Sequence, residues 1–67
     1  MTGPAKVVYV VIHYTNPDES APIGVCDTLD EAKTFEPGGW HDYGDGTWTN
    51  GPCEIRKTPY WPKAAGT

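Results

Sequence analysis

The sequence is poor in basic residues, has only two cysteines and contains no long hydrophobic run. Five lysines and arginines stand against nine aspartates and glutamates, which gives a formal net charge of −4. Such a chain has few cations to neutralise phosphates or anionic lipids, so neither nucleic acid nor a membrane is expected as a partner. The apolar run at residues 7–12 is too short for a membrane span or a signal-peptide core. We therefore expect a cytoplasmic protein.

The scarcity of cysteine limits the metal and redox chemistry that can be expected. Without an export signal, Cys26 and Cys53 are expected to be free thiols that pack as small hydrophobic residues. Together with His13 and His41 they could supply the ligand atoms of a tetrahedral zinc site. No Cys-x-x-Cys or His-x-x-x-His spacing brings any two of them together. We expect no metal and no cofactor, and zinc binding is the alternative.

Aromatic residues are abundant by contrast, with three tryptophans, four tyrosines and one phenylalanine in 67 residues. A chain of this length has a small interior, and aromatic rings bury large areas with little loss of rotamer freedom. We expect a single domain over residues 1–67 that is held together mainly by aromatic packing. The ends at 1–5 and 63–67 are expected to be frayed.

A strand followed by a helix is the clearest local pattern. The sequence Ile-Gly-Val-Cys at 23–26 is typical of a short strand, and Thr28 and Glu31 have the spacing of a capping box. Asp30 and Glu31 would complement the positive end of the helix dipole. The helix is expected to run for two to three turns and to end at the Pro-Gly-Gly sequence at 37–39. Its apolar stripe would consist of Leu29, Ala32 and Phe35.

Other segments complete the predicted fold. Residues 6–14 form a β-branched and aromatic run typical of a central strand, and the prolines in 15–22 indicate a loop. Residues 40–52 indicate a loop or irregular hairpin with turns at Asp45-Gly46 and Asn50-Gly51, and the alternation in 53–58 predicts a half-buried strand. The predicted class is α+β, an antiparallel sheet of three to four strands with one short helix on one face, in ββαβ or ββαββ order.

Both faces of the first strand are largely apolar. One face would carry Val8, Val10, Ile12 and Tyr14, and the other Val7, Tyr9, Val11 and His13. Because one short helix covers only one face, we expect segment 40–52 to cover the second. The C-terminal residues Tyr60 and Trp61, a partner protein or a second copy are the alternatives. The exposed rims of aromatic rings are frequent binding hot spots. The predicted partner-contacting residues are Tyr9, His13, Trp40, Tyr43 and Trp48.

Catalytic motifs are lacking. Ser20 has no neighbouring base or elbow motif, and Asp27, Asp30 and Glu31 are accounted for by helix capping. The sequence around Asp42 and Asp45 lacks the ligand pattern of a calcium loop, so a turn is expected there. Residues 56–62 match a basic-x-x-Pro-x-x-Pro pattern, but we expect them to end the last strand and to pin the C-terminus through Tyr60 and Trp61. The chain is not expected to be an enzyme.

A resemblance adds a biological setting. The segments 9–13 and 23–32, with Gly-Val-Cys-Asp-Thr-Leu-Asp-Glu-Ala at 24–32, resemble small ββα-containing accessory proteins of bacteriophages and actinobacteria. Those proteins share a Gly-Val-aromatic-Asp-Thr/Ser-x-x-Glu-Ala junction, and here Cys26 stands at the aromatic position. The resemblance implies a cytosolic factor that binds and modulates a host protein. A binder of a small ligand such as a nucleotide or sugar, and a structural homodimer, are the alternative hypotheses.

Overall fold

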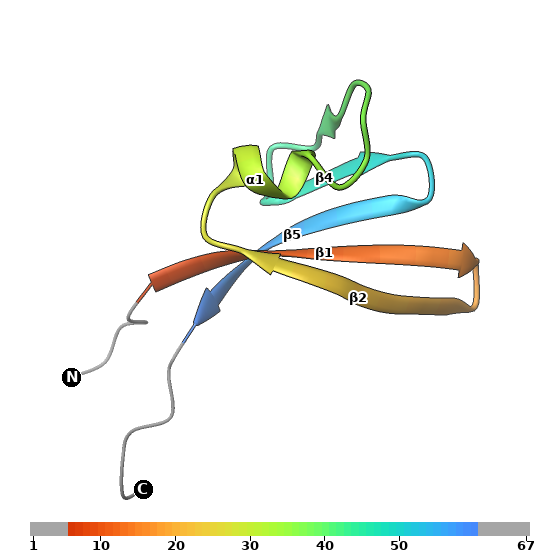
Figure 1. Cartoon of the computed structure of the whole chain (residues 1–67), viewed down its shortest axis with the longest axis horizontal. Helices are drawn as coiled ribbons and strands as arrows, with labels where there is room; N and C mark the ends of the chain where they lie inside the picture. The colour runs from red at the N-terminus through yellow and green to blue at the C-terminus, as the bar shows by residue number, and fades with distance from the viewer. Residues whose placement is uncertain (1–5, 61–67) are drawn as a thin grey trace, which may run out of the picture.

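The fold is a five-stranded antiparallel sheet with one short helix (Figure 1). The computed structural model describes residues 6–60. Neighbouring strands follow the spatial order β2-β1-β5-β4-β3, and every neighbouring pair is antiparallel. The elements in chain order are β1 (Lys6–Asn16), β2 (Glu19–Cys26), α1 (Leu29–Lys33), β3 (His41–Asp42), β4 (Thr47–Asn50) and β5 (Cys53–Tyr60).

The antiparallel sheet and the single short helix confirm the main part of the predicted fold, but the sheet has five strands rather than three to four. Segment 40–52 supplies the additional strands, because β3 and β4 form a hairpin that is paired to β5. β1 is paired on both sides, as expected of an interior strand, although β5 holds the middle position. The predicted frayed ends at 1–5 and 63–67, and the expected anchoring role of Trp61, lie outside the described residues.

The predicted loop at 15–22 is wrong, because most of it belongs to a tight hairpin. β1 continues to Asn16 and β2 begins at Glu19, so only two residues turn the chain. The Asn16 side chain stabilises this turn, since its Oδ1 accepts a hydrogen bond from the Asp18 N–H at 2.9 Å. Pro22 is tolerated because β2 is an edge strand and because the pairing register shifts beside it, between Val11 and Ile12.

The helix is shorter than predicted, with five residues instead of two to three turns. Its start confirms the expected cap, because Thr28 Oγ1 accepts a hydrogen bond from the Glu31 N–H at 3.2 Å. Its end is set by Thr34, whose N–H and hydroxyl both donate to the Glu31 carbonyl, at 3.1 and 2.6 Å. Phe35 therefore lies beyond α1 and does not continue its apolar stripe.

Phe35 instead packs over Gly24 in β2. A Cβ atom at Gly24 would overlap Cζ of the Phe35 ring and lie 2.7 Å from its Cε2 atom. The absence of a side chain at Gly24 lets the ring rest on the strand backbone. The contact joins the segment after α1 to the edge strand, although the Phe35 side chain stays 42% exposed.

The main hydrophobic cluster lies on one face of the sheet, while Val8 of β1, which is 6% exposed, is buried outside this cluster. Val11, Ile55 and Trp48 are cross-strand neighbours on β1, β5 and β4, and Ala32 of α1 is buried among them. Four partly buried residues pack around this cluster: Tyr9, Cys26, Leu29 and Trp40. We call this side the α1 face and the opposite side the open face.

The prediction that segment 40–52 covers the second face of β1 is wrong. β4 is part of the sheet, and its register with β5 places Trp48 opposite Ile55, on the same face as Ala32. Ala32 of α1, Trp48 and Trp40 therefore pack in one cluster on the same face of the sheet. Val8, Val10, Ile12 and Tyr14 point to the open face, where Val8 is nonetheless buried. The described residues place no other helix or strand over this face.

The contact between Gly24 and Phe35 predicts that the effect of Gly24→Ala on the free energy of unfolding changes sign when the Phe35 ring is removed. Gly24→Ala should lower the free energy of unfolding by about 1 kcal/mol, because the new methyl displaces the Phe35 ring. In a Phe35→Ala background the same change should stabilise the protein by about 0.5 kcal/mol, because alanine suits a strand better than glycine once the ring is gone. Urea unfolding followed by tryptophan fluorescence gives the four values of the cycle. Equal effects of Gly24→Ala in both backgrounds would contradict the packing described.

Candidate functional site

Three of the five predicted contact residues are mainly packing residues of the α1 face. The ring centroids of Tyr9 and Trp48 lie 5.9 Å apart, and the Trp48 side chain is only 9% exposed. Trp40 Nε1 donates to the carbonyl oxygens of Lys33 and Glu36, at 3.3 and 3.2 Å. These bonds fix the chain segment after α1 against the core. Trp48→Ala would thus remove core volume, so it is a poor probe of binding.

The other two predicted residues lie apart from this cluster. His13 is half-buried at the far end of the α1 face, opposite Cys53 on β5. Tyr43 is 55% exposed on the open face, with its hydroxyl 3.3 Å from Thr49 Oγ1 and its ring edge-on to His41 at 4.3 Å. The five residues therefore do not form one continuous surface. Their contact with a partner stays a prediction.

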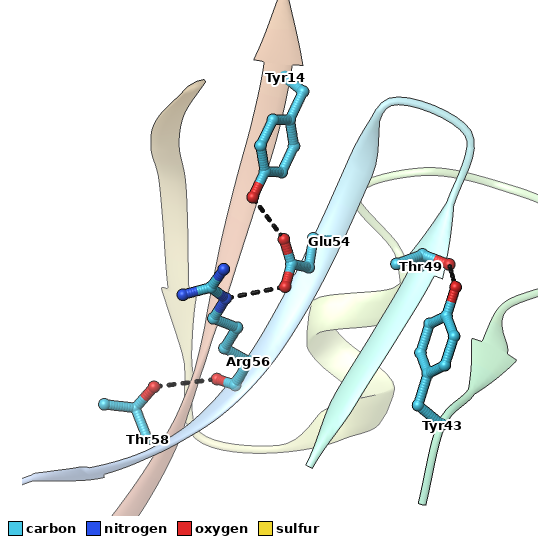
Figure 2. A network of polar contacts seen from close by, with 6 residues as sticks. All are labelled: Tyr14, Tyr43, Thr49, Glu54, Arg56 and Thr58. Atoms are coloured by element: carbon cyan, nitrogen blue, oxygen red, sulfur yellow. Dashed lines mark hydrogen bonds and ion pairs between the residues drawn. The ribbon is translucent and has the colours of Figure 1, made fainter. Parts of the chain in front are cut away.

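The open face carries a row of ordered polar side chains (Figure 2). Figure 2 shows them on the near side of the sheet with α1 behind it. Register explains their common side, because Glu54 lies opposite Ile12 and Thr49, while Arg56 lies opposite Val10 and Thr47. The labelled residues are Tyr14, Tyr43, Thr49, Glu54, Arg56 and Thr58.

Glu54 is at the centre of the row. Tyr14 donates its hydroxyl hydrogen to Glu54 Oε1 at 2.7 Å, and Arg56 Nε donates to Oε2 at 2.8 Å. The Glu54 side chain is 12% exposed, whereas that of Arg56 is 57% exposed. The carboxylate is thus held on both oxygens and largely shielded, while the guanidinium is oriented by Glu54 and still accessible to a partner.

The hydrogen bonds and charges of this row shift the pKa values of Glu54, Tyr14 and Arg56. Partial burial raises the pKa of Glu54, but the hydrogen bonds from Arg56 and Tyr14 outweigh it and hold the pKa below its ordinary value. The bond to Glu54 also raises the pKa of Tyr14, and the same carboxylate raises the pKa of Arg56. The network therefore favours a charged Glu54, a neutral Tyr14 and a charged Arg56.

Sequence analysis missed Tyr14, Glu54 and Arg56 as site residues. The alternation in residues 53–58 predicts that Glu54 and Arg56 lie on the solvent-exposed face of a strand. The link to Tyr14 spans 40 positions in the sequence and depends on the pairing of β1 with β5. No local pattern contains that information.

An apolar strip lies beside the polar row. Val10 and Ile12 on β1 neighbour Arg56 and Glu54 on β5, and both are half-buried. Val25 on β2 lies opposite Val10 and is 64% exposed, so the strip reaches the edge of the sheet. The open face therefore combines apolar, aromatic and charged side chains.

The cysteines occupy separate positions. Cys26 lies opposite Tyr9 on one side of β1, and Cys53 lies opposite His13 on its other side; both thiols are free. Burial, reinforced by nearby carboxylates, raises the pKa of both thiols. Among residues 6–60, no group of three or more histidine, cysteine, aspartate or glutamate side chains could hold a metal ion. Within the same residues, α1 is far too short to cross a membrane.

The Tyr14–Glu54 bond predicts a specific change in acid stability. Because the pKa of folded Glu54 lies below its unfolded value, its stabilising effect is present above the unfolded pKa and is lost as the pH falls through the folded pKa. Tyr14→Phe removes one donor, so the Glu54 pKa should rise and acid unfolding should begin at a higher pH. NMR titration of the Glu54 carboxyl carbon measures this shift directly.

Tyr43→Phe is the matched control for that experiment. It removes a tyrosine hydroxyl from the same face, but this hydroxyl lies against Thr49 and contacts no carboxylate. The Glu54 pKa should therefore be unchanged. A shift of equal size in both variants would contradict a direct role of the Tyr14 hydroxyl.

Comparison with known proteins supplies no relative: a scan against protein-family models, a search of curated proteins and a search of solved structures each found no match. The resemblance of residues 9–13 and 23–32 to phage accessory proteins therefore stays a prediction.

Proposed function

We propose that this chain is a small non-catalytic α+β domain, with α1 on one face, that binds another protein through the open face. The observation that supports this most is the combination of an oriented Arg56, an exposed Tyr43 and the apolar strip on one sheet face. Tyrosine and arginine are enriched in protein interfaces, and Arg56 is already ordered by Glu54 before a partner arrives.

The chemistry of the face also describes the partner. A guanidinium held by Glu54 through Nε keeps its outer edge accessible, and that edge suits a carboxylate of the partner. The adjacent Val10 and Val25 suit apolar side chains. We therefore expect a partner patch in which an aspartate or glutamate stands beside aliphatic or aromatic residues.

The proposed setting is a phage-type accessory factor that acts on a host protein in the cytoplasm. This part of the proposal is supported by the resemblance of the strand-to-helix junction alone. A small planar ligand is the second candidate, favoured by the exposed edge-on pair of His41 and Tyr43.

Variants of Arg56 and Tyr43, with Lys57 as a control, test the proposed surface. Arg56→Ala should weaken capture of a host protein about tenfold, as should Tyr43→Ala, because each removes an exposed contact of the open face. Lys57→Ala is the matched control, since Lys57 is the next residue on β5, is also exposed and points to the α1 face. Partners captured from host lysate with the wild-type protein would be identified by mass spectrometry, and their affinities for each variant measured with purified components.

Two results would overturn the proposal. Equal affinities of wild type, Arg56→Ala and Tyr43→Ala would place the contact elsewhere. Saturable chemical-shift changes at His41 and Tyr43 on titration with nucleotides or sugars, without a captured protein, would favour the small-ligand alternative.

A further inference from the structure

The outer edge of β2 is a second candidate interaction surface. β2 is eight residues long and ends the sheet on one side, whereas the edge strand on the other side, β3, has only two residues. Along an edge strand, outward N–H and C=O groups have no neighbouring strand to bond. Among residues 6–60, β2 therefore provides the long edge at which another strand could pair.

Exposed hydrophobic side chains gather at this edge. Within the described residues, five large hydrophobic side chains are exposed, and Ile23 and Val25 of β2 are two of them, at 46% and 64%. Phe35, which packs over Gly24 of the same strand, is a third. The remaining two are Tyr43, which follows β3, and Tyr60, the last residue of β5. Exposed aliphatic residues on an open edge are the features that favour strand addition.

The distribution of charge indicates which strand would pair there. The chain carries a net charge of −4, so two copies repel one another over most of their surface. β2 is an exception, because its only charged residue is Glu19 at its first position. Asp27, just beyond its last position, is paired with Lys6 at 2.9 Å. Two copies of this chain can therefore bring their β2 edges together with little repulsion.

Two features of β2 limit the length over which another strand could pair with it. Pro22 has no N–H to donate, and the register shift beside it disturbs the first half of the strand. The uninterrupted part is residues 24–26, Gly-Val-Cys, which carries no charge, whereas Ile23 is the extra residue at the register shift and has no partner on β1. An antiparallel pair of this stretch with its own copy, centred on Val25, would place the two Val25 side chains opposite each other across the contact.

We propose that two copies of this chain associate through antiparallel pairing of their β2 edges, centred on residues 24–26, to form a continuous ten-stranded sheet. The contact is short, so we expect a reversible dimer with a dissociation constant between about 1 μM and 1 mM. This inference does not rest on the proposed partner binding, because it uses the sheet edge and not the open face.

Sedimentation equilibrium of the whole 7.3 kDa chain over a wide concentration range measures the association. The average mass of the wild type should rise toward that of a dimer with increasing concentration. Val25→Lys and Ile23→Lys should each weaken association at least about tenfold, because each places a like charge at the pairing edge. Tyr43→Lys is the matched control, since it makes the same exchange of an exposed hydrophobic residue at the opposite edge, and should associate like the wild type.

Hydrogen exchange separates edge pairing from packing of open faces. The outward amides of residues 24–26 should exchange more slowly as the concentration rises, and Arg56→Ala should leave both this protection and the association unchanged. Far-ultraviolet circular dichroism confirms that each variant is folded. The proposal is overturned if the wild type remains a monomer up to about 1 mM. It is also overturned if association is lost in Arg56→Ala but retained in both β2 variants.

Discussion

The register of β1, β5 and β4 is the constraint on which the rest of the structure depends. It aligns Val11, Ile55 and Trp48 on one face, where Ala32 of α1 closes over them. Because side chains alternate along a strand, the same register turns Glu54 and Arg56 to the opposite face. A shift of β5 by one residue would bury those two charges and expose Ile55. The core and the polar row are therefore two consequences of one pairing.

The helix depends on the sheet more than the sheet depends on the helix. Five residues form little more than one turn, and isolated helices of that length are unstable in water. α1 is held by the Thr28 cap at its start, by Thr34 at its end and by burial of Ala32. Trp40 adds two hydrogen bonds to carbonyls near the helix end. The aromatic residues thus contribute by fixing a short helix in place as well as by filling the core.

The features that could be predicted from the sequence are local ones: the Thr28 cap, the β-branched run of β1 and the alternation in β5. The features that could not be predicted depend on neighbours distant in the sequence. From the sequence, Pro22 indicates a loop, but β2 is an edge strand and can contain a proline. Likewise, the spacing of Phe35 predicts that it continues the helical stripe, but its ring packs over Gly24. In the candidate site, Tyr43 is exposed and its contact with a partner stays a prediction, whereas the Tyr14–Glu54 bond depends on the pairing of β1 with β5.

The open face and the β2 edge meet at Val25, which lies opposite Val10 and is also the most exposed large hydrophobic residue described. In an antiparallel pair of identical strands, the two-fold axis is perpendicular to the sheet, so both open faces would lie on the same side. The apolar strip of one copy would then continue across the edge into that of the other. A partner with two matching patches would bind both copies at once, and the second contact would benefit from a high effective concentration. Edge pairing would thus strengthen binding at the open face without any new contact to the partner.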